Sequence, residues 1–134
     1  LTDNVGETEF FFFYNRAAKN TISKKFGYDA KLIKKIKTST LDKIINEANL
    51  SEIEIDFLSI DVEGSELNVL KGFNLKKFKP KIILLEYIEH NVKEFYQKDI
   101  NTIINSEIYL YMVANNYKLI NWNHDDLMFM YKSL

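Results

Sequence analysis

The stretch from Ile55 to Leu67 constrains the fold more than any other part of the sequence. It opens with a mostly apolar run, rich in β-branched and aromatic residues, which is typical of a buried strand. The run ends in Asp61, Glu63 and Gly64, and apolar residues then recur at helical spacing up to Gly72. We therefore predict a central parallel strand followed by a helix that stops at Gly72.

Acidic residues follow two strands of the predicted sheet. Asp61 and Glu63 come after the central strand, and a second buried strand over residues 81–87 carries Glu86 near its end. Ligands of open α/β sheets bind at the carboxyl ends of strands, so Asp61 and Glu63 are the first candidates for catalysis. One of them could act as a general base, or Asp61 and Glu86 could hold a hard cation such as Mg²⁺.

Structural roles are the alternative for these carboxylates. Glu63 could favour the positive end of the helix that follows it, and Asp61 could accept hydrogen bonds from the loop backbone. Six further polar residues are weaker candidates, because ordinary loop or turn positions would explain them equally well: Arg16, Asn20, Ser23, Glu89, His90 and His124.

Length, charge and cysteine content narrow the function classes. The chain has 134 residues, a formal net charge of −1 and no cysteine. A single domain is expected, and the near-neutral charge gives no electrostatic case for binding nucleic acid or an anionic membrane. The lack of cysteine excludes disulfides and thiol catalysis and suits the reducing cytoplasm. No apolar run approaches the roughly 18 residues that a membrane-spanning helix needs.

The remaining sequence predicts an α/β layered sheet. A strand over residues 7–14 should be buried on both faces, because residues 10–13 are all aromatic, and alternating lysines over 31–39 suggest an edge strand. Ser39 or Thr40 should cap a helix. The apolar face of that helix would consist of Leu41, Ile44, Ile45 and Ala48. The other expected elements are helices over 92–116 with a break near 105–106, then strands over 117–122 and 127–131 that pair as an antiparallel hairpin. The predicted apolar stripe of those helices comprises Ile100, Ile103, Ile104, Ile108, Tyr111 and Met112.

Residues Ile55–Gly72 resemble the signature of the FkbM family of S-adenosylmethionine-dependent methyltransferases. In that family an apolar strand leads into an Ile-Asp-Val-Glu-Gly run, a Glu-Leu pair and a Leu-Lys-Gly ending. Three further segments resemble the family in the same order along the chain. Leu1–Glu7 is similar to the turn after its third strand, Thr40–Asp42 to the start of a short helix, and Pro80–Glu86 to its next strand, which ends in glutamate.

The resemblance implies a partial Rossmann-like class I methyltransferase sheet, mostly parallel, whose last two strands come from the hairpin at 117–131. It implies methyl transfer from S-adenosylmethionine to an oxygen of a sugar, a polyketide or another small metabolite, so the expected partner is a small molecule with a hydroxyl group. By position, Asp61 would lie beside the donor and the acceptor. It would deprotonate the hydroxyl or help to hold a metal ion, with Glu86 as a second ligand.

One departure from the family concerns the donor site. The family's first strand and its glycine-rich loop, which receive the amino-acid end of the donor, have no counterpart here. The four glycines of the chain are Gly6, Gly27, Gly64 and Gly72, and none forms a Gly-x-Gly loop. We therefore expect residues 1–134 to be the C-terminal portion of a single methyltransferase domain, with weak or no cofactor binding by this chain.

Two other functions are compatible with the sequence. The chain could be a non-catalytic fragment or binding module that keeps the methyltransferase sheet. It could also be a phosphatase similar to the haloacid dehalogenases, which use a nucleophilic Asp and a second Asp two residues later. Glu63 occupies the second position here, and Asp125–Asp126 precedes a strand rather than following one, which counts against the phosphatase.

Overall fold

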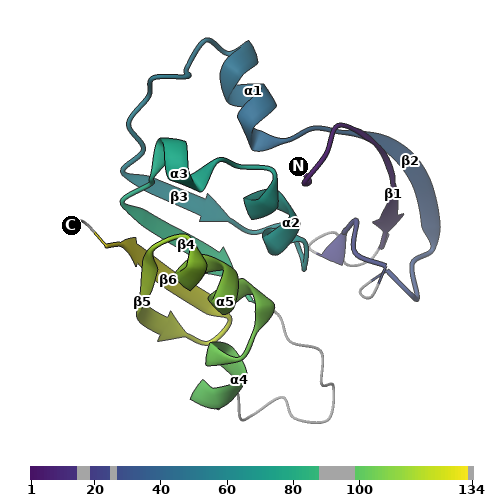
Figure 1. Ribbon diagram of the computed structural model, residues 1–134. Helices are drawn as coiled ribbons and strands as arrows, with labels where there is room; N and C mark the ends of the chain where they lie inside the picture. Colours follow the sequence, from purple (N-terminus) through teal and green to yellow (C-terminus); the bar gives the residue numbers. More distant parts are fainter. Residues whose placement is uncertain (15–18, 25–26, 88–98, 133–134) are drawn as a thin grey trace.

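The computed structural model describes residues 1–14, 19–24, 27–87 and 99–132, which form an α/β protein with two separate sheets (Figure 1). The strands are β1 (Gly6–Phe12), β2 (Leu32–Thr38), β3 (Phe57–Ile60), β4 (Ile82–Glu86), β5 (Tyr117–Asn123) and β6 (Asp126–Tyr131). The helices are α1 (Leu41–Glu47), α2 (Glu66–Lys71), α3 (Leu75–Phe78), α4 (Ile100–Ile104) and α5 (Glu107–Ala114). In the described part of the chain, no helix is long and apolar enough to cross a membrane.

The larger sheet has four strands in the order β3-β4-β6-β5. β3 and β4 are parallel, whereas β6 is antiparallel to both of its neighbours, β4 and β5. Three strands therefore run in one direction, and the last strand of the chain is inserted between two of them in the opposite direction. The expected antiparallel C-terminal hairpin is confirmed.

β1 and β2 form a two-stranded antiparallel sheet of their own, to one side of the larger sheet (Figure 1). The expectation of one continuous layered sheet is therefore wrong for these strands, although residues 32–38 do form an edge strand. The aromatic run is also not buried on both faces: Phe11 is 6% exposed, but Phe10, Phe12 and Phe13 are half-buried. The faces of a strand are covered by other layers that pack on its sheet, and among the described residues the separate β1–β2 ribbon is not enclosed between two such layers.

β3 lies at the edge of its sheet among the described strands, not at the centre as predicted. Phe57 is 53% exposed, and burial alternates along β3, β4 and β6. The buried face of the sheet carries Leu58, Ile60, Ile83, Leu85, Leu127 and Phe129, which belong to or pack against one core that includes residues of α2 and α5. The opposite face carries exposed or half-buried side chains, including Phe57, Ile82, Leu84, Met128 and Met130. A strand covered on one face explains this alternation.

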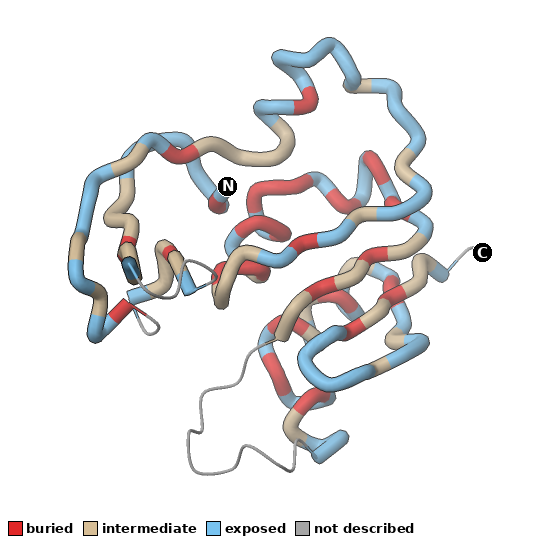
Figure 2. Tube along the Cα trace, turned by 180° about the vertical axis from the view of Figure 1, so that it is seen from behind, coloured by how far each residue is buried: buried red, intermediate tan, exposed pale blue. Residues whose placement is uncertain are grey.

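Buried residues concentrate in the four-stranded sheet and its helices, as the tube coloured by burial shows (Figure 2). α2 and α5 contact each other, and the Tyr111 hydroxyl of α5 donates a hydrogen bond of 3.2 Å to the Leu70 carbonyl oxygen. Tyr117, fully buried at the start of β5, donates through its hydroxyl to the Pro80 carbonyl oxygen at 3.0 Å. These two bonds tie the C-terminal half of the core to the segment between β3 and β4.

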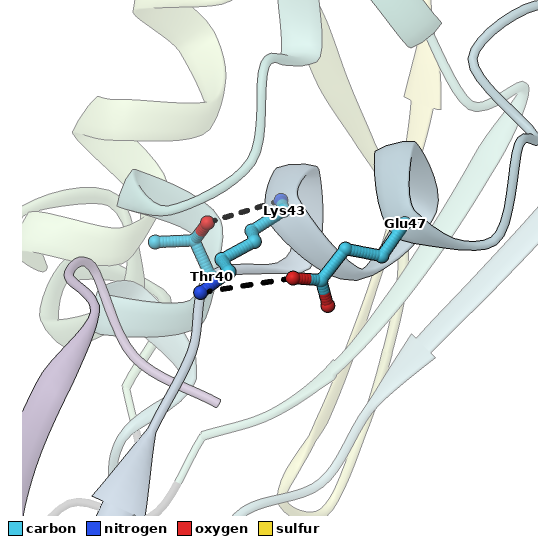
Figure 3. Close-up of polar contacts among 3 residues, drawn as sticks. All are labelled: Thr40, Lys43 and Glu47. Atoms are coloured by element: carbon cyan, nitrogen blue, oxygen red, sulfur yellow. Dashed lines mark hydrogen bonds and ion pairs between the residues drawn. The ribbon is translucent and has the colours of Figure 1, made fainter.

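α1 begins at the predicted cap. The Thr40 side-chain oxygen accepts a 3.1 Å hydrogen bond from the Lys43 backbone N–H, and Lys43 pairs with Glu47 one turn later at 3.7 Å (Figure 3). The predicted apolar face is half right: Ile45 is buried and Leu41 packs partly buried against the core, whereas Ile44 is 43% exposed and Ala48 is exposed. The cap thus fixes where the helix starts, and α1 contacts the core through two of the four predicted side chains.

The C-terminal helices break where the sequence indicated. Ser106 caps α5 by accepting a 3.2 Å hydrogen bond from the Tyr109 N–H, and its hydroxyl donates to the Ile103 carbonyl oxygen at 2.7 Å. Ile103, Ile108 and Met112 from the predicted stripe are buried, while Ile100 and Ile104 are exposed. Residues 92–98 of the predicted helical segment lie outside the described residues. The short helix α3, capped by Asn74, was not predicted.

Gly72 ends α2 as predicted, but glycine is not needed there for the left-handed conformation that usually favours it at a helix end. Its φ of −86° is open to any residue, so no left-handed conformation requires glycine here. A Cβ atom at this position would overlap the carbonyl oxygen of Thr2. Thr2 is buried, and its N–H donates to the Ser39 carbonyl oxygen at 3.0 Å. Figure 1 places the N-terminus beside α2 accordingly. Gly72 is therefore the point at which the N-terminal segment packs against the core.

This close approach predicts that Gly72→Ala destabilises the fold by about 1–3 kcal/mol, because the methyl group must displace buried backbone. The matched control is Gly6→Ala, where the nearest atoms to an added Cβ are at 3.7 and 3.9 Å. That variant should stay within about 0.5 kcal/mol of the parent. Urea unfolding followed by circular dichroism measures both. Equal stability of the two variants would contradict the proposed packing of Thr2 on α2.

Candidate functional site

The register of the parallel strands brings together the acidic residues that follow them. Ile60 pairs with Leu85, so Asp61, directly after β3, lies beside Glu86, the last residue of β4. Carboxylate oxygens of Asp61, Glu63 and Glu86 all lie within 4.8 Å of one another. We call these three residues the acidic cluster. The prediction that both strand ends present carboxylates at one edge of the sheet is confirmed.

The members of the acidic cluster differ in exposure. Asp61 is exposed to solvent, whereas Glu63 and Glu86 are partly buried. The ion pairs among the described residues join Lys24 to Glu9, Lys43 to Glu47 and Lys81 to Asp56, so none of them neutralises the cluster. Asp61 therefore stays accessible to a molecule that approaches the edge of the sheet.

Burial and neighbouring negative charges raise the pKa values of Glu63 and Glu86. The pKa of Glu86 is raised from 4.5 to about 7, mainly because the carboxyl group is partly buried. The negative charges of Asp61 and Glu63 contribute the next largest part of this rise. Burial also raises the pKa of Glu63, again with a contribution from Asp61, and the nearby Lys19 ammonium opposes this rise. The Glu86 Oε2 atom is buried without a hydrogen-bond partner in the described part of the protein. Near neutral pH the cluster thus takes up or releases a proton readily.

Glu66 holds the loop that carries Glu63, and the sequence analysis did not single it out. Its Oε1 atom accepts hydrogen bonds from the N–H groups of Val62 and Gly64, both at 3.0 Å. The residue is 5% exposed although it carries a carboxylate. An acid at the first turn of a helix is common at exposed positions, so nothing in the sequence indicates that this one is buried and binds the loop.

A second support comes from the segment between β1 and β2. Thr21 is 1% exposed and donates through Oγ1 to the carbonyl oxygen of Glu63 at 2.7 Å. Thr21 is held in turn by two backbone hydrogen bonds with Phe11 of β1, at 2.8 and 3.2 Å. The sequence analysis missed Thr21 as well, because a contact across 42 positions leaves no local signal.

The weaker candidates have structural roles where the structure describes them. The Asn20 side-chain oxygen accepts from the Phe13 N–H at 2.9 Å, and the Ser23 N–H donates to Thr21 Oγ1 at 2.9 Å. His124 is exposed in the β5–β6 turn, as predicted, and its carbonyl oxygen accepts from the Trp122 indole N–H at 2.7 Å. Arg16, Glu89 and His90 lie outside the described residues.

A cavity of about 320 Å³ adjoins the loop that follows Glu63. Gly64 and Ser65 form one wall of it, and the two-stranded sheet forms another. Most side chains that line it are polar, among them Thr8, Ser23, Thr38 and Asn68. The hydroxyl of Thr38 is buried there without a hydrogen-bond partner among the described residues. Such a lining suits a hydrated or hydroxylated molecule better than an apolar one.

Three accessible or partly buried carboxylates at one sheet edge can do two kinds of chemistry. They can accept a proton from a bound hydroxyl, and burial raises the pKa of Glu63 and of Glu86. They can also coordinate a hard divalent cation, because carboxylate oxygens are the ligands that Mg²⁺ and Ca²⁺ prefer. The donor set of Asp61, Glu63 and Glu86 fits either use.

Comparison with protein-family models matched residues 2–119 to the methyltransferase FkbM domain. Searches among curated proteins and among solved structures found no match to the chain. The matched region includes both sheet strands that carry the acidic cluster and the two-stranded sheet that supports it. The chain therefore belongs to the FkbM methyltransferase domain family, and its general activity is that of a methyltransferase.

Proposed function

We propose that the protein transfers a methyl group from S-adenosylmethionine to a hydroxyl oxygen of a small metabolite, and that the acidic cluster accepts the hydroxyl proton. The observation that carries this proposal is the meeting of Asp61, Glu63 and Glu86 at the carboxyl ends of two parallel strands. Ligands of α/β sheets bind at this edge, and the family match makes methyl transfer the general reaction.

The acidic cluster would act through its raised proton affinity. The donor, when bound, supplies a methyl group on a positively charged sulfur. The hydroxyl oxygen of the acceptor forms the new bond to the methyl carbon, the carbon–sulfur bond breaks, and the hydroxyl proton moves to a carboxylate. Asp61 is the exposed member and would meet the acceptor hydroxyl, and the Glu86 carboxylate, whose pKa is raised to about 7, lies beside it as a place for the proton.

The order and directions of the larger sheet support a Rossmann-like assignment. Three strands run in one direction and the last strand is inserted antiparallel between two of them, and the last two strands come from the hairpin, as the resemblance implied. The four glycines of this sequence form no Gly-x-Gly loop, so these residues do not supply the loop expected around the amino-acid end of the donor.

The chemistry of the polar cavity beside Gly64 and Ser65 suits the proposed acceptor, although Asp61, Glu63 and Glu86 are not among the residues that line it. Hydroxyl, amide and carboxylate groups line it, and these can form hydrogen bonds with a small molecule that carries several hydroxyl groups. Nothing in the composition favours nucleic acid or a membrane as a partner, because the net charge is −1. The cytoplasm remains the expected compartment because the sequence lacks cysteine.

Cation binding is a second candidate role for the same residues. The buried Oε2 atom of Glu86 lacks a hydrogen-bond partner in the described part of the chain, and Asp61 and Glu63 offer oxygens within reach. Asp61 and Glu86 would be the principal ligands of an ion such as Mg²⁺. A bound cation would draw the acceptor oxygen to the site and favour its deprotonated form.

The two alternative functions, a phosphatase and a non-catalytic binding module, differ in how well they agree with the match to the FkbM methyltransferase domain. A phosphatase receives no support from the match to a methyltransferase domain. A binding module without catalysis keeps the same sheet and stays an alternative, which the loss of methyl transfer on substitution of the acidic cluster would separate from the enzyme.

Asp61→Asn is predicted to lower kcat for methyl transfer by about 10²–10⁴-fold, because it removes the proposed proton acceptor with little change of shape. Transfer of a radiolabelled methyl group from S-adenosylmethionine to a panel of monosaccharides and simple polyols measures it, in the protein as its gene encodes it. Asp56→Asn is the control, since Asp56 precedes β3 and pairs with Lys81 at 2.6 Å. It should retain activity within about twofold. Full activity of Asp61→Asn would refute the role of Asp61.

The raised pKa of Glu86 predicts that stability falls as pH rises. The folded protein binds the Glu86 proton more tightly than the unfolded chain, so this contribution is fully present below pH 4.5 and is lost as pH rises through about 7. After allowance for solvent screening, we expect a loss on the order of 1–2 kcal/mol by pH 8. Urea unfolding at pH 4.5, 6 and 8 measures it.

Glu86→Gln should flatten this pH profile, whereas Glu47→Gln, at an exposed residue of α1, should not. If the cluster also binds a cation, millimolar Mg²⁺ at pH 8 raises the midpoint of the parent protein and leaves that of Glu86→Gln unchanged. A pH profile that is the same for the parent and for Glu86→Gln would show that Glu86 is not the titrating group.

Isothermal titration of this chain with S-adenosylmethionine should give an affinity weaker than about 1 mM. The reason is that no glycine-rich loop among its residues can hold the amino-acid end of the donor. Adenosine serves as the control ligand, because it lacks that end and should bind no more weakly if the missing loop is the cause. Micromolar affinity for S-adenosylmethionine would overturn this expectation and would mean that another part of the chain supplies these contacts.

A further inference from the structure

The loop from Val62 to Gly64 places the Glu63 side chain in the acidic cluster. Two effects, backbone strain and charge repulsion, disfavour this placement. The loop backbone is unusual, because Glu63 has a φ of +55° and Gly64 a φ of +88°, and a side chain such as that of glutamate disfavours the left-handed region. The carboxylate of Glu63 also lies near those of Asp61 and Glu86, which repel it. Other contacts must therefore hold this loop in place.

Glu66 supplies contacts on the helix side of the loop. One carboxylate oxygen accepts hydrogen bonds from the N–H groups of both Val62 and Gly64 at 3.0 Å, so it binds the residues on either side of Glu63. Hydrogen bonds to a charged acceptor are stronger than neutral ones, and Glu66 is 5% exposed, which shields them from water. The negative charge of Glu66 adds to the repulsion in the cluster, and burying that charge costs free energy. The two hydrogen bonds to the loop N–H groups offset this cost.

Thr21 supplies the contact on the opposite side. Its hydroxyl donates to the carbonyl oxygen of Glu63 at 2.7 Å, and the residue is 1% exposed. Paired backbone hydrogen bonds with Phe11 attach Thr21 to β1. The two-stranded sheet thereby reaches the loop of the acidic cluster, although β1 and β2 pair with neither strand of that site.

We propose that Glu66 and Thr21 are positioning residues, which together fix the Val62–Gly64 loop so that the Glu63 carboxylate stays in the acidic cluster. Glu66 binds the two N–H groups of the loop, and Thr21 binds the carbonyl group between them. Neither residue transfers a proton or touches the acceptor in this assignment. The assignment rests on the proposed function only in naming proton transfer as the use of the cluster.

Paired substitutions at each position separate the hydrogen bonds from shape and charge. Glu66→Leu removes the acceptor, and Glu66→Gln keeps an amide oxygen for it without the charge. Thr21→Val removes the hydroxyl at nearly constant volume, and Thr21→Ser keeps it. The first variant of each pair should free the loop, and the second should restore most of the parent behaviour.

Amide hydrogen exchange measured by NMR tests the loop itself and needs no donor or acceptor. Exchange at Val62 and Gly64 should rise by about tenfold in Glu66→Leu, the change expected when a hydrogen bond to a charged group is lost, and by less than about threefold in Glu66→Gln. Thr21→Val should accelerate the same amides, and Thr21→Ser should not. Core amides at Leu70 and Leu85, both fully buried, report whether a variant is still folded.

Methyl transfer by the protein as its gene encodes it gives the second readout. In Glu66→Leu and Thr21→Val, kcat should fall about tenfold or more while KM for the acceptor stays within about twofold, because the loop positions a proton acceptor and does not bind the substrate. A uniform loss from destabilisation would instead lower the active fraction, which the core amides detect.

The outcomes separate this inference from the proposed function. If the parent protein shows no methyl transfer, the proposed function fails, but faster exchange at Val62 and Gly64 in Glu66→Leu and Thr21→Val still supports the positioning role. Unchanged exchange at both amides, with the core amides intact, overturns that role whatever the activity. Faster exchange in Glu66→Leu alone, with Thr21→Val like the parent, overturns the assignment of Thr21.

Discussion

The parallel pairing of β3 with β4 is the interaction on which the rest of the site depends. Because Ile60 pairs with Leu85, the residues that leave the two strands emerge side by side, and both are acidic. Ile60 and Leu85 are themselves buried in the core, so the hydrophobic packing that fixes the register also fixes the separation of the carboxylates. A shift of one residue would turn Ile60 and Leu58 away from α2 and α5, and the cost of exposing them protects the geometry of the site.

The loop backbone beside the acidic cluster takes its hydrogen-bond partners from outside the cluster. One carboxylate oxygen of Glu66 accepts hydrogen bonds from two loop N–H groups, and the Thr21 hydroxyl donates one to the carbonyl oxygen of Glu63. The three cluster carboxylates are left with few partners of their own, and burial together with mutual repulsion raises the pKa of Glu86 to about 7. A group that titrates near neutral pH can exchange protons with a substrate under the conditions in which the protein works.

Local patterns in the sequence predicted what depends on neighbouring residues. The Thr40 cap, the break before Ser106 and the C-terminal hairpin follow from short-range hydrogen bonding or chain reversal, and all are found. The helix stop at Gly72 is also found, although the need for glycine there comes from the distant backbone of Thr2. Burial and sheet membership depend on distant partners, which no window of sequence contains. The aromatic run at 10–13 looked like a strand buried on both faces, yet β1 pairs only with β2 among the described strands, and the apolar run at 55–60 looked central, yet β3 lies at an edge.

The residues of the candidate site also fall into those that local sequence patterns predict and those that depend on distant partners. Asp61, Glu63 and Glu86 could be predicted, because acids at the ends of apolar strands are visible in the sequence and parallel strands end at one edge. Glu66 and Thr21 could not, because their importance lies in which backbone groups they bind, and one of them reaches its partner from 42 residues away. Residues that touch a substrate are chosen for their chemistry, which sequence displays directly. Residues that hold them in position are chosen for geometry, and only the folded chain displays that.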